Sequence, residues 1–191
     1  DVFSAPLLRD VATRVRERLA QGTALALPEL VRLPDAQRLS ARASDVQRGL
    51  WLTWHHDPSS AAYNMSGELS LKGELDAAAL RRAFDAVVRR HEILRARFVL
   101  DDEGEPLQVI DDTLSIPLEW TRLDALSSEV PEAREATLDA LIARVAHEPF
   151  DLERGPLVRA HLVSVGGHEQ RLLLALHHIV ADGWSVNVLL A

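Results

Sequence analysis

The sequence predicts a mixed α/β fold in which helices flank a sheet. Residues 76–90 place apolar side chains at helical spacing, so that they form one stripe along a helix. The apolar run Leu172–Leu176 has the length of a buried strand. Two turn sequences, Asp101–Gly104 and Gly166–Gly167, each lie between runs with strand character, as in β-hairpins. Helical and strand patterns therefore alternate along the chain.

The other elements follow in chain order. Ser4 is placed to cap a helix from about Ala5 to Gln21, whose apolar residues lie roughly on one side. Residues 22–39 contain two prolines and indicate a linker. Beyond it the sequence predicts helices from Ser44 to about Trp54, after the N-cap Asp76, at 131–147 and at 184–190, and strands at 66–71, 94–100, 106–110, 117–121, 157–165 and 169–176.

Composition excludes several classes of protein. The 191 residues are 47% hydrophobic, which is typical of a globular domain with a real core. With 21 basic and 29 acidic side chains, the net charge of −8 argues against a nucleic-acid partner. The chain contains no cysteine, hence no disulfide and no thiol nucleophile. No apolar run approaches the roughly 20 residues of a membrane span and no signal peptide is evident, so we expect a cytoplasmic protein without a membrane partner.

The most informative segment is His177–Ser185 (HHIVADGWS), which directly follows the apolar run. Successive side chains on a strand point to opposite faces, so His177 and His178 are expected to have different surroundings, one in a core and one facing a cleft. A neutral imidazole can accept a proton near neutral pH. Gly183 permits a sharp turn with positive φ, and a helix is expected from Trp184 onward. The segment therefore joins a strand end to a helix start.

Other interpretations of this segment exist. The two histidines could be hydrogen-bonded structural residues. A zinc site would lack an evident third ligand. Ser185 does not lie in the Gly-X-Ser-X-Gly elbow of serine hydrolases. The structural interpretation stays open beside a catalytic one, whereas zinc and serine chemistry are weaker.

Three motifs in order resemble those of condensation domains of nonribosomal peptide synthetases. His177–Ser185 resembles the HHxxxDGWS motif of that family. Arg90–Phe98 (RHEILRARF) resembles RHExLRTxF, with alanine where threonine is usual. Ser44–Trp51 (SDVQRGLW) resembles SxxQxRLW, with its arginine and glycine out of the usual arrangement. The resemblance covers about residues 38–191.

The resemblance implies an activity. Condensation domains join two thioesters held on the phosphopantetheine arms of carrier domains, and the amine of the downstream acceptor attacks the upstream donor thioester to form a peptide bond. It implies no cofactor bound to the domain itself, donor and acceptor carrier domains as partners, and a role in antibiotic biosynthesis and other secondary metabolism. The second motif histidine, here His178, is the one tied to catalysis, as a general base or as a positioning group.

The resemblance also implies supporting residues. The motif aspartate, here Asp182, is expected to pair with Arg95. Arg97 is the alternative partner, because both arginines would project from one face of a strand at 94–98. The remaining motif residues of the expected site are His177, Gly183, Trp184 and Ser185.

The same residues separate this chain from relatives of the family. Epimerisation domains usually follow Asp-Gly with Ser-Trp, whereas this chain has Trp184-Ser185. Heterocyclisation domains replace both histidines with Asp-type residues, and both are present here. The alternatives that remain are a non-catalytic carrier-binding or docking module, with structural histidines, and an epimerisation-type relative.

The resemblance extends to domain organisation. Residues 38–191 are expected to form the N-terminal lobe of a condensation domain, similar to chloramphenicol acetyltransferase, with a mixed sheet and flanking helices. Residues 1–22 resemble the last helix of a peptidyl carrier domain, or else form an ordinary amphipathic helix, and 23–37 would be the linker. The chain begins with Asp1 rather than Met, so we expect a fragment. The resemblance implies a full condensation domain of two lobes and about twice this length, and the sequence stops at Ala191, just inside the helix after the motif. We therefore expect the chain to lack the C-terminal lobe and to be inactive in isolation.

Overall fold

The structure is a computed structural model that describes residues 7–21, 29, 31, 34, 38–123, 131–166 and 168–190. The chain forms two compact units, Asp1–Leu33 and Pro34–Ala191. The condensation-domain motifs all lie in the second unit, which therefore holds the candidate site.

The first unit contains the helix α1 (Leu8–Ala20), which the sequence predicted. Its apolar side chains include Leu8 and Leu19, which are 84% and 76% exposed. No residue of α1 itself is buried. The expected cap, Ser4, and most of the expected linker lie outside the described residues.

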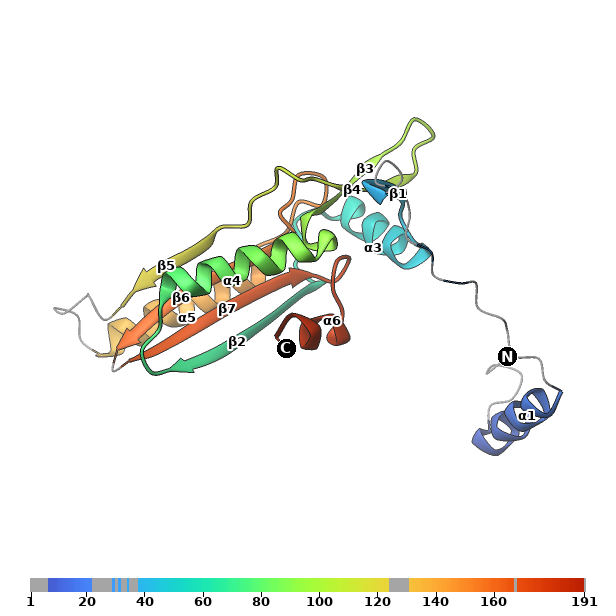
Figure 1. Cartoon of the computed structure of the whole chain (residues 1–191), viewed down its shortest axis with the longest axis horizontal. Helices are drawn as coiled ribbons and strands as arrows, with labels where there is room; N and C mark the ends of the chain where they lie inside the picture. The colour runs from blue at the N-terminus through green and yellow to red at the C-terminus, as the bar shows by residue number, and fades with distance from the viewer. Residues whose placement is uncertain are drawn as a thin grey trace. The chain divides into compact units, whose positions relative to one another are not determined.

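The second unit is built on a four-stranded sheet in the order β2-β7-β6-β5 (Figure 1). β2 (Asn64–Lys72) is antiparallel to β7 (Glu169–His177), and β7 is antiparallel to β6 (Val158–Gly166). β6 is parallel to β5 (Leu118–Arg122). The single parallel pair makes the sheet mixed, so the predicted fold class is confirmed.

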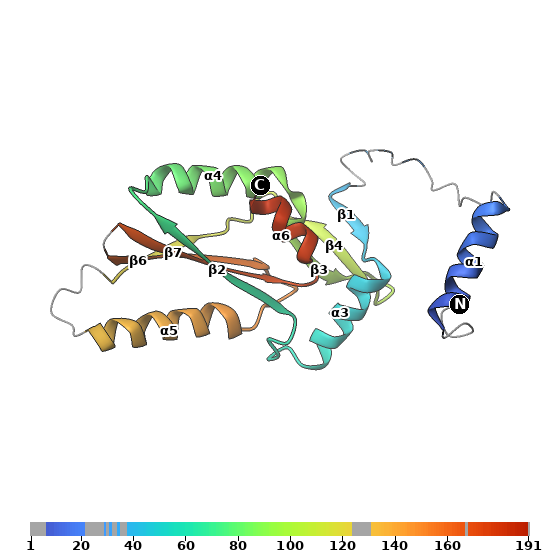
Figure 2. The ribbon, with the colours of Figure 1, turned by 90° about the horizontal axis from the view of Figure 1, so that it is seen from below.

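Helices cover both faces of this sheet. α4 (Ala77–Arg90) lies over one face and α5 (Pro131–His147) over the other, as Figure 2 shows. The short α6 (Gly183–Leu190) shares the face of α4, since Leu189 and Phe84 border one pocket over the sheet. The result is a layered α/β arrangement.

A second, three-stranded sheet lies at one end of the unit. Its order is β1-β4-β3, and both pairings are antiparallel. The strands are β1 (Ser40–Arg42), β3 (Ala96–Leu100) and β4 (Pro106–Ile110), and α3 (Asp45–His56) follows β1 directly.

Side-chain caps explain where two helices begin. Ser44 and Gln47 form a capping box at the start of α3, in which each side chain accepts a hydrogen bond from the other residue's backbone N–H. Asp76 caps α4 by accepting from the N–H of Ala79 at 2.9 Å. Both predicted caps, Ser44 and Asp76, are confirmed.

The core has two parts, one for each face of the large sheet. On the α5 side, Leu173 and Ala175 of β7 pack with Trp51 of α3 and Phe98 of β3. On the α4 side, Leu176 packs with residues that include Val88 and Ala181. The alternation along β7 thus divides its side chains between two cores.

One predicted strand begins later than expected. Residues 94 and 95 belong to a 3-10 helix, Glu92–Arg95, and β3 starts only at Ala96. The backbone N–H of Leu94 donates to the carbonyl of His91 at 3.0 Å, so a tight turn replaces the start of the strand. Arg95 and Arg97 are therefore not neighbours on one strand face, contrary to the prediction.

Candidate active site

The histidine motif lies in a loop that connects β7 to α6. The backbone N–H of His178 donates to the carbonyl of Tyr63 at 2.9 Å, which continues the β2–β7 pairing one residue past the strand. The apolar residues that follow, Ile179, Val180 and Ala181, are 3%, 5% and 6% exposed. Burial of these three side chains holds the loop against the core.

His177 is a buried structural residue. It is 3% exposed and its ring meets the ring of Phe150 edge-on, with 6.2 Å between centroids. Its Nδ1 accepts a hydrogen bond from the backbone N–H of Ile179 at 3.1 Å. Burial, and secondarily the neighbouring His178, lowers the pKa of His177 to about 4. The ring is therefore neutral at neutral pH and serves to shape the loop.

His178 is exposed, in contrast to its neighbour. Its Nδ1 lies 2.8 Å from the carbonyl oxygen of Ala181. A carbonyl oxygen can only accept, so Nδ1 carries the proton and donates it. In the neutral ring, Nε2 then keeps its lone pair and can accept a proton or a hydrogen bond. The two histidines thus differ in surroundings, as the alternation of a strand predicts.

Asp182 caps the helix that follows the motif. Its Oδ1 accepts from the backbone N–H of Ser185 at 2.8 Å and from the Ser185 hydroxyl at 2.6 Å. These bonds from Ser185 lower the pKa of the Asp182 carboxyl, with smaller contributions that include the charge of His178. The side chain is exposed. Asp182 therefore fixes the start of α6.

The expected pairing of Asp182 with Arg95 is wrong. Arg95 is buried, forms an ion pair with Asp112, and its Nε donates to the carbonyl of Val88 at 3.3 Å. The 3-10 turn directs the Arg95 side chain back toward α4, and the hydrogen bonds that Asp182 accepts come from Ser185.

Arg97, the alternative, is also not the partner of Asp182. Its Nε lies 3.8 Å from Oδ2 of Asp111. Hydrogen bonds from Thr113 are the main cause that lowers the pKa of Asp111, and the charge of Arg97 adds to them. The two motif arginines thus pair with the neighbouring acids, Asp111 and Asp112, of one loop.

The remaining motif residues lie at the start of α6. Gly183 is the first residue of the helix, and its φ is not in the positive region, contrary to the expectation for a sharp turn. The turn is made by the Asp182 cap and needs no left-handed residue. Trp184 is 78% exposed. Ser185 is half-buried and completes the cap.

Gln47 contacts the motif loop, although it was not among the residues predicted for the site. Its Nε2 donates to Oε1 of Gln108 at 2.9 Å and lies 3.4 Å from the carbonyl oxygen of Ile179. It thereby links α3 and β4 to the residue after His178. The signal was present, because Gln47 is the glutamine of the first motif.

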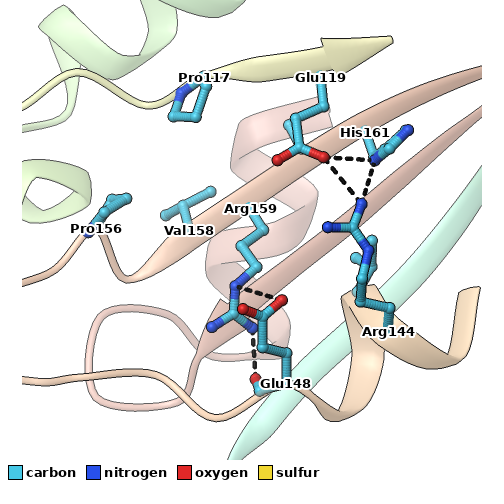
Figure 3. Close-up of a pocket in the computed structure, with 10 residues that line it drawn as sticks. Pro117, Glu119, Arg144, Glu148, Pro156, Val158, Arg159 and His161 are labelled. Atoms are coloured by element: carbon cyan, nitrogen blue, oxygen red, sulfur yellow. Dashed lines mark hydrogen bonds and ion pairs between the residues drawn. The ribbon is translucent and has the colours of Figure 1, made fainter. Parts of the chain in front are cut away.

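A second polar cluster lies between α5 and the sheet (Figure 3). Nδ1 of buried His161 is 3.0 Å from Glu119, and Arg144 donates to the same carboxylate at 2.9 Å. The bond from Arg144 lowers the pKa of Glu119, and burial lowers the pKa of His161. The pocket beside them measures only about 60 Å³. A space of this size has room for a water molecule or two but not for a substrate, so we interpret the cluster as structural.

The described part of the chain offers neither a metal site nor a membrane span. It contains no group of three or more His, Cys, Asp or Glu side chains that could hold a metal ion. Among the same residues, no helix is both long enough and apolar enough to cross a membrane.

Fold and loop together define an α/β lobe with an exposed histidine at a strand end. The chain belongs to the condensation-domain family, since residues 38–191 match the family described as "Condensation domain". Chondramide synthase of Chondromyces crocatus is 46% identical over 171 residues, which are 90% of this chain and 4% of that protein. A linear gramicidin synthase of Brevibacillus parabrevis is 39% identical over 189 residues, which are 98% of this chain and 2% of that protein.

Solved structures agree with this assignment. The first condensation domain of the calcium-dependent antibiotic synthetase, in complex with a substrate analogue, has a TM-score of 0.68 and 29% identity. The match covers 78% of this chain and 35% of that one. The starter condensation domain of rhizomide synthetase shares the fold, with a TM-score of 0.71, 24% identity, and coverage of 79% and 35%. The chain therefore corresponds to about a third of these solved condensation-domain chains.

The relatives place the domain in a biological context. They include a linear gramicidin synthase and a phosphinothricin tripeptide synthetase, and one solved relative is a four-domain nonribosomal peptide synthetase. Membership of this family supports a condensation role of the acyl-transfer type.

Proposed function

We propose that this domain forms a peptide bond between a donor thioester and an acceptor amine, each held on the phosphopantetheine arm of a carrier domain. The observation that carries the proposal is the state of His178. Its side chain is exposed, and the bond from Nδ1 to the Ala181 carbonyl leaves Nε2 as an acceptor. An exposed, oriented imidazole at the end of a strand suits a reaction in which an amine must lose a proton.

In the proposed reaction, Nε2 of His178 interacts with the attacking amine. The acceptor amine adds to the donor carbonyl carbon, and its nitrogen gains positive charge as the bond forms. Nε2 of His178 takes up the amine proton, or holds the amine by a hydrogen bond. The C–S bond then breaks, and the donor phosphopantetheine leaves as a thiolate that takes up a proton. General-base action is typically worth about 10²–10⁴ in rate, and alignment of two tethered substrates contributes more.

The other motif residues position His178 in this proposal. His177 anchors the loop in the core through Phe150 and the N–H of Ile179. Asp182 and Ser185 fix the start of α6 directly after the loop.

We further propose that the rest of a condensation domain and two carrier domains complete the site. The comparison supports this, because the chain covers only 35% of single solved condensation-domain chains. Residues 1–22 are proposed to be the last helix of the upstream carrier, with 23–37 as the linker. The exposed apolar residues of α1, such as Leu8 and Leu19, suit a helix that packs on a carrier domain.

The test is a dipeptide-forming assay on the intact synthetase that contains this sequence, with loaded donor and acceptor carriers. His178→Ala is expected to abolish or strongly reduce product. His56→Ala, at an exposed position on α3, is the matched control. Near-normal condensation by folded His178→Ala would remove the residue from the mechanism and favour a docking module with structural histidines.

The same assay tests the proposal that further domains are required. The 191-residue chain alone, supplied with both loaded carriers, is expected to release no dipeptide above the carrier-only background. Product formed by the chain alone would show that this lobe is sufficient.

A further inference from the structure

An apolar pocket lies on the sheet face that carries His178. It has a volume of about 260 Å³ and is bordered by β2, β7 and α6. The side chains that matter here are Met65 of β2, Leu174 and Leu176 of β7, and Val186 and Leu189 of α6. The backbone of β2 at Gly67 forms part of the same wall. α6 lies close to β2 in both views of the chain (Figures 1 and 2).

The pocket and His178 lie on the same face because of strand alternation. Leu174 and Leu176 line the pocket, and His178 is the next residue in that row. Met65 is the register partner of Leu176, and the hydrogen bond from His178 to the Tyr63 carbonyl continues the pairing. At about 3.4 Å per residue, the near end of the pocket lies roughly 7 Å along the strand from His178.

Gly67 leaves room that any other residue would fill. It is the register partner of Leu174, and its place in the row lies between Met65 and Leu69. A Cβ built at Gly67 meets nothing within 4 Å, and φ of Gly67 is not in the positive region. Neither backbone conformation nor a close approach therefore requires glycine here. Glycine inside a strand lowers stability, so its effect at this position is the open space above the strand.

We propose that this pocket holds the apolar side chain of one of the two carrier-bound amino acids, and that Gly67 sets the depth of the pocket. The inference rests on the proposed peptide-bond-forming function. Pockets for whole drug-sized ligands measure about 300–1,000 Å³, so a volume of about 260 Å³ suits part of a substrate. Ser66 and Glu68 of β2 also border the pocket, but strand alternation directs their side chains to the other face of the sheet, where Glu68 pairs with Arg171. The leucine, valine and methionine side chains that face the pocket offer no partner for a charged side chain, and they favour an aliphatic or aromatic one.

The test uses the intact synthetase with variants of Gly67. Gly67→Ala and Gly67→Leu are compared with wild type in dipeptide formation. The substrates form a series from glycine through alanine, valine and leucine to phenylalanine. In one arm the donor side chain varies with the acceptor fixed, and in the other arm the acceptor varies. The arm that responds identifies which substrate occupies the pocket.

The expected result is a loss that grows with side-chain size in one arm. For Gly67→Leu, kcat/KM falls about tenfold or more for leucine and phenylalanine and less than about twofold for glycine, with Gly67→Ala between. Val186→Phe narrows the same pocket from α6 and is expected to repeat the pattern if Gly67→Leu fails to fold. Gly49→Leu, an exposed glycine with open space around it on α3, makes the same chemical change elsewhere and is expected to leave the series unchanged.

Two outcomes overturn the inference. An equal loss for every substrate in both arms means that polypeptide of the same domain fills the pocket. No change for any substrate means that the pocket is not used. The proposed function is tested separately, because His178→Ala is expected to lower all rates regardless of side-chain size. Retained activity of that variant would refute the role of His178 without altering the size dependence measured at Gly67.

Discussion

Nδ1 of His178 donates to the carbonyl oxygen of Ala181 at 2.8 Å, so the motif loop itself selects the histidine tautomer. The donor and acceptor are three residues apart, and Ala181 is buried. The loop backbone therefore holds the ring by a hydrogen bond of its own. The residues between His178 and Asp182 therefore have two separate roles. The carbonyl of Ala181 orients the imidazole, and Asp182 caps the next helix.

Replacement of His178 should affect activity far more than stability. The side chain is exposed and has one hydrogen bond to the backbone, and surface changes are usually worth within about 0.5 kcal/mol. We expect His178→Ala to keep its midpoint of chemical unfolding while product formation falls by about 10²–10⁴ if the ring acts as a base. His178→Asn, which can keep a donor near the position of Nδ1, is not expected to restore activity. Unfolding of His178→Ala near neutral pH would contradict the assignment.

Acidification should destabilise the domain through His177. Its pKa is about 4 in the folded state and about 6.5 when unfolded, so the unfolded chain binds a proton first as the pH falls. The contribution of His177 to the free energy of unfolding is fully present above pH ~6.5. It declines by about 1.4 kcal/mol per pH unit down to pH ~4, which is about 3 kcal/mol in total. Denaturant titrations at several pH values measure this decline.

His177→Asn is the comparison for that pH effect. Asparagine keeps an acceptor for the N–H of Ile179 but does not titrate in this range. His161, whose pKa burial also lowers, contributes in the same direction in both proteins. The difference between wild type and variant therefore isolates His177. If the free energy of unfolding falls equally in the two proteins between pH ~6.5 and ~4, then the pKa of His177 is not lowered in the folded state.

Removal of the helix cap at Asp182 should lower stability moderately, and the size of the effect should depend on whether the replacement can still accept a hydrogen bond. Asp182→Ala removes the acceptor for both bonds from Ser185, so we expect a lower thermal midpoint. Asp182→Asn should retain most of the midpoint, because asparagine caps helices about as well as aspartate. The lowered pKa of Asp182 predicts that its contribution is present above pH ~4 and is lost as the pH falls below that value. A large loss in Asp182→Asn would instead indicate a charged partner.

Local patterns were sufficient for most of the fold. The predicted helix at 131–147 has the same bounds as α5, and Ser44 and Asp76 cap helices as their side chains suggested. The different surroundings of His177 and His178 followed from strand alternation alone. These features depend on hydrogen bonds and side-chain directions within a few residues, which the sequence determines directly.

Long-range side-chain pairing could not be predicted in the same way. Arg95 pairs with Asp112 rather than Asp182 because a 3-10 turn at Glu92–Arg95 directs its side chain. The apolar pattern of that segment did not predict the turn. Gln47 reaches Ile179 across 132 positions, and only the folded chain brings them together. The pocket at Gly67 likewise requires α6 to lie over β2 and β7. Each of these depends on how separate elements meet.

Arg95 offers a direct test of which acid it pairs with. Its side chain is only 10% exposed, whereas that of Asp112 is 66% exposed. Because the guanidinium has few other partners, we expect Asp112→Ala to lower the free energy of unfolding by about 1 kcal/mol, and Arg95→Leu to cost more through lost packing and the lost bond to Val88. Urea titrations of the single variants measure both.

A double-mutant cycle then separates the two possible partners. Because Arg95 and Asp112 are in contact, the double variant Arg95→Leu/Asp112→Ala should lose less than the two single changes together. Arg95→Leu and Asp182→Ala share no contact, so their effects should add. Coupling between Arg95 and Asp182, with additivity between Arg95 and Asp112, would show that the motif acid and the motif arginine pair in solution.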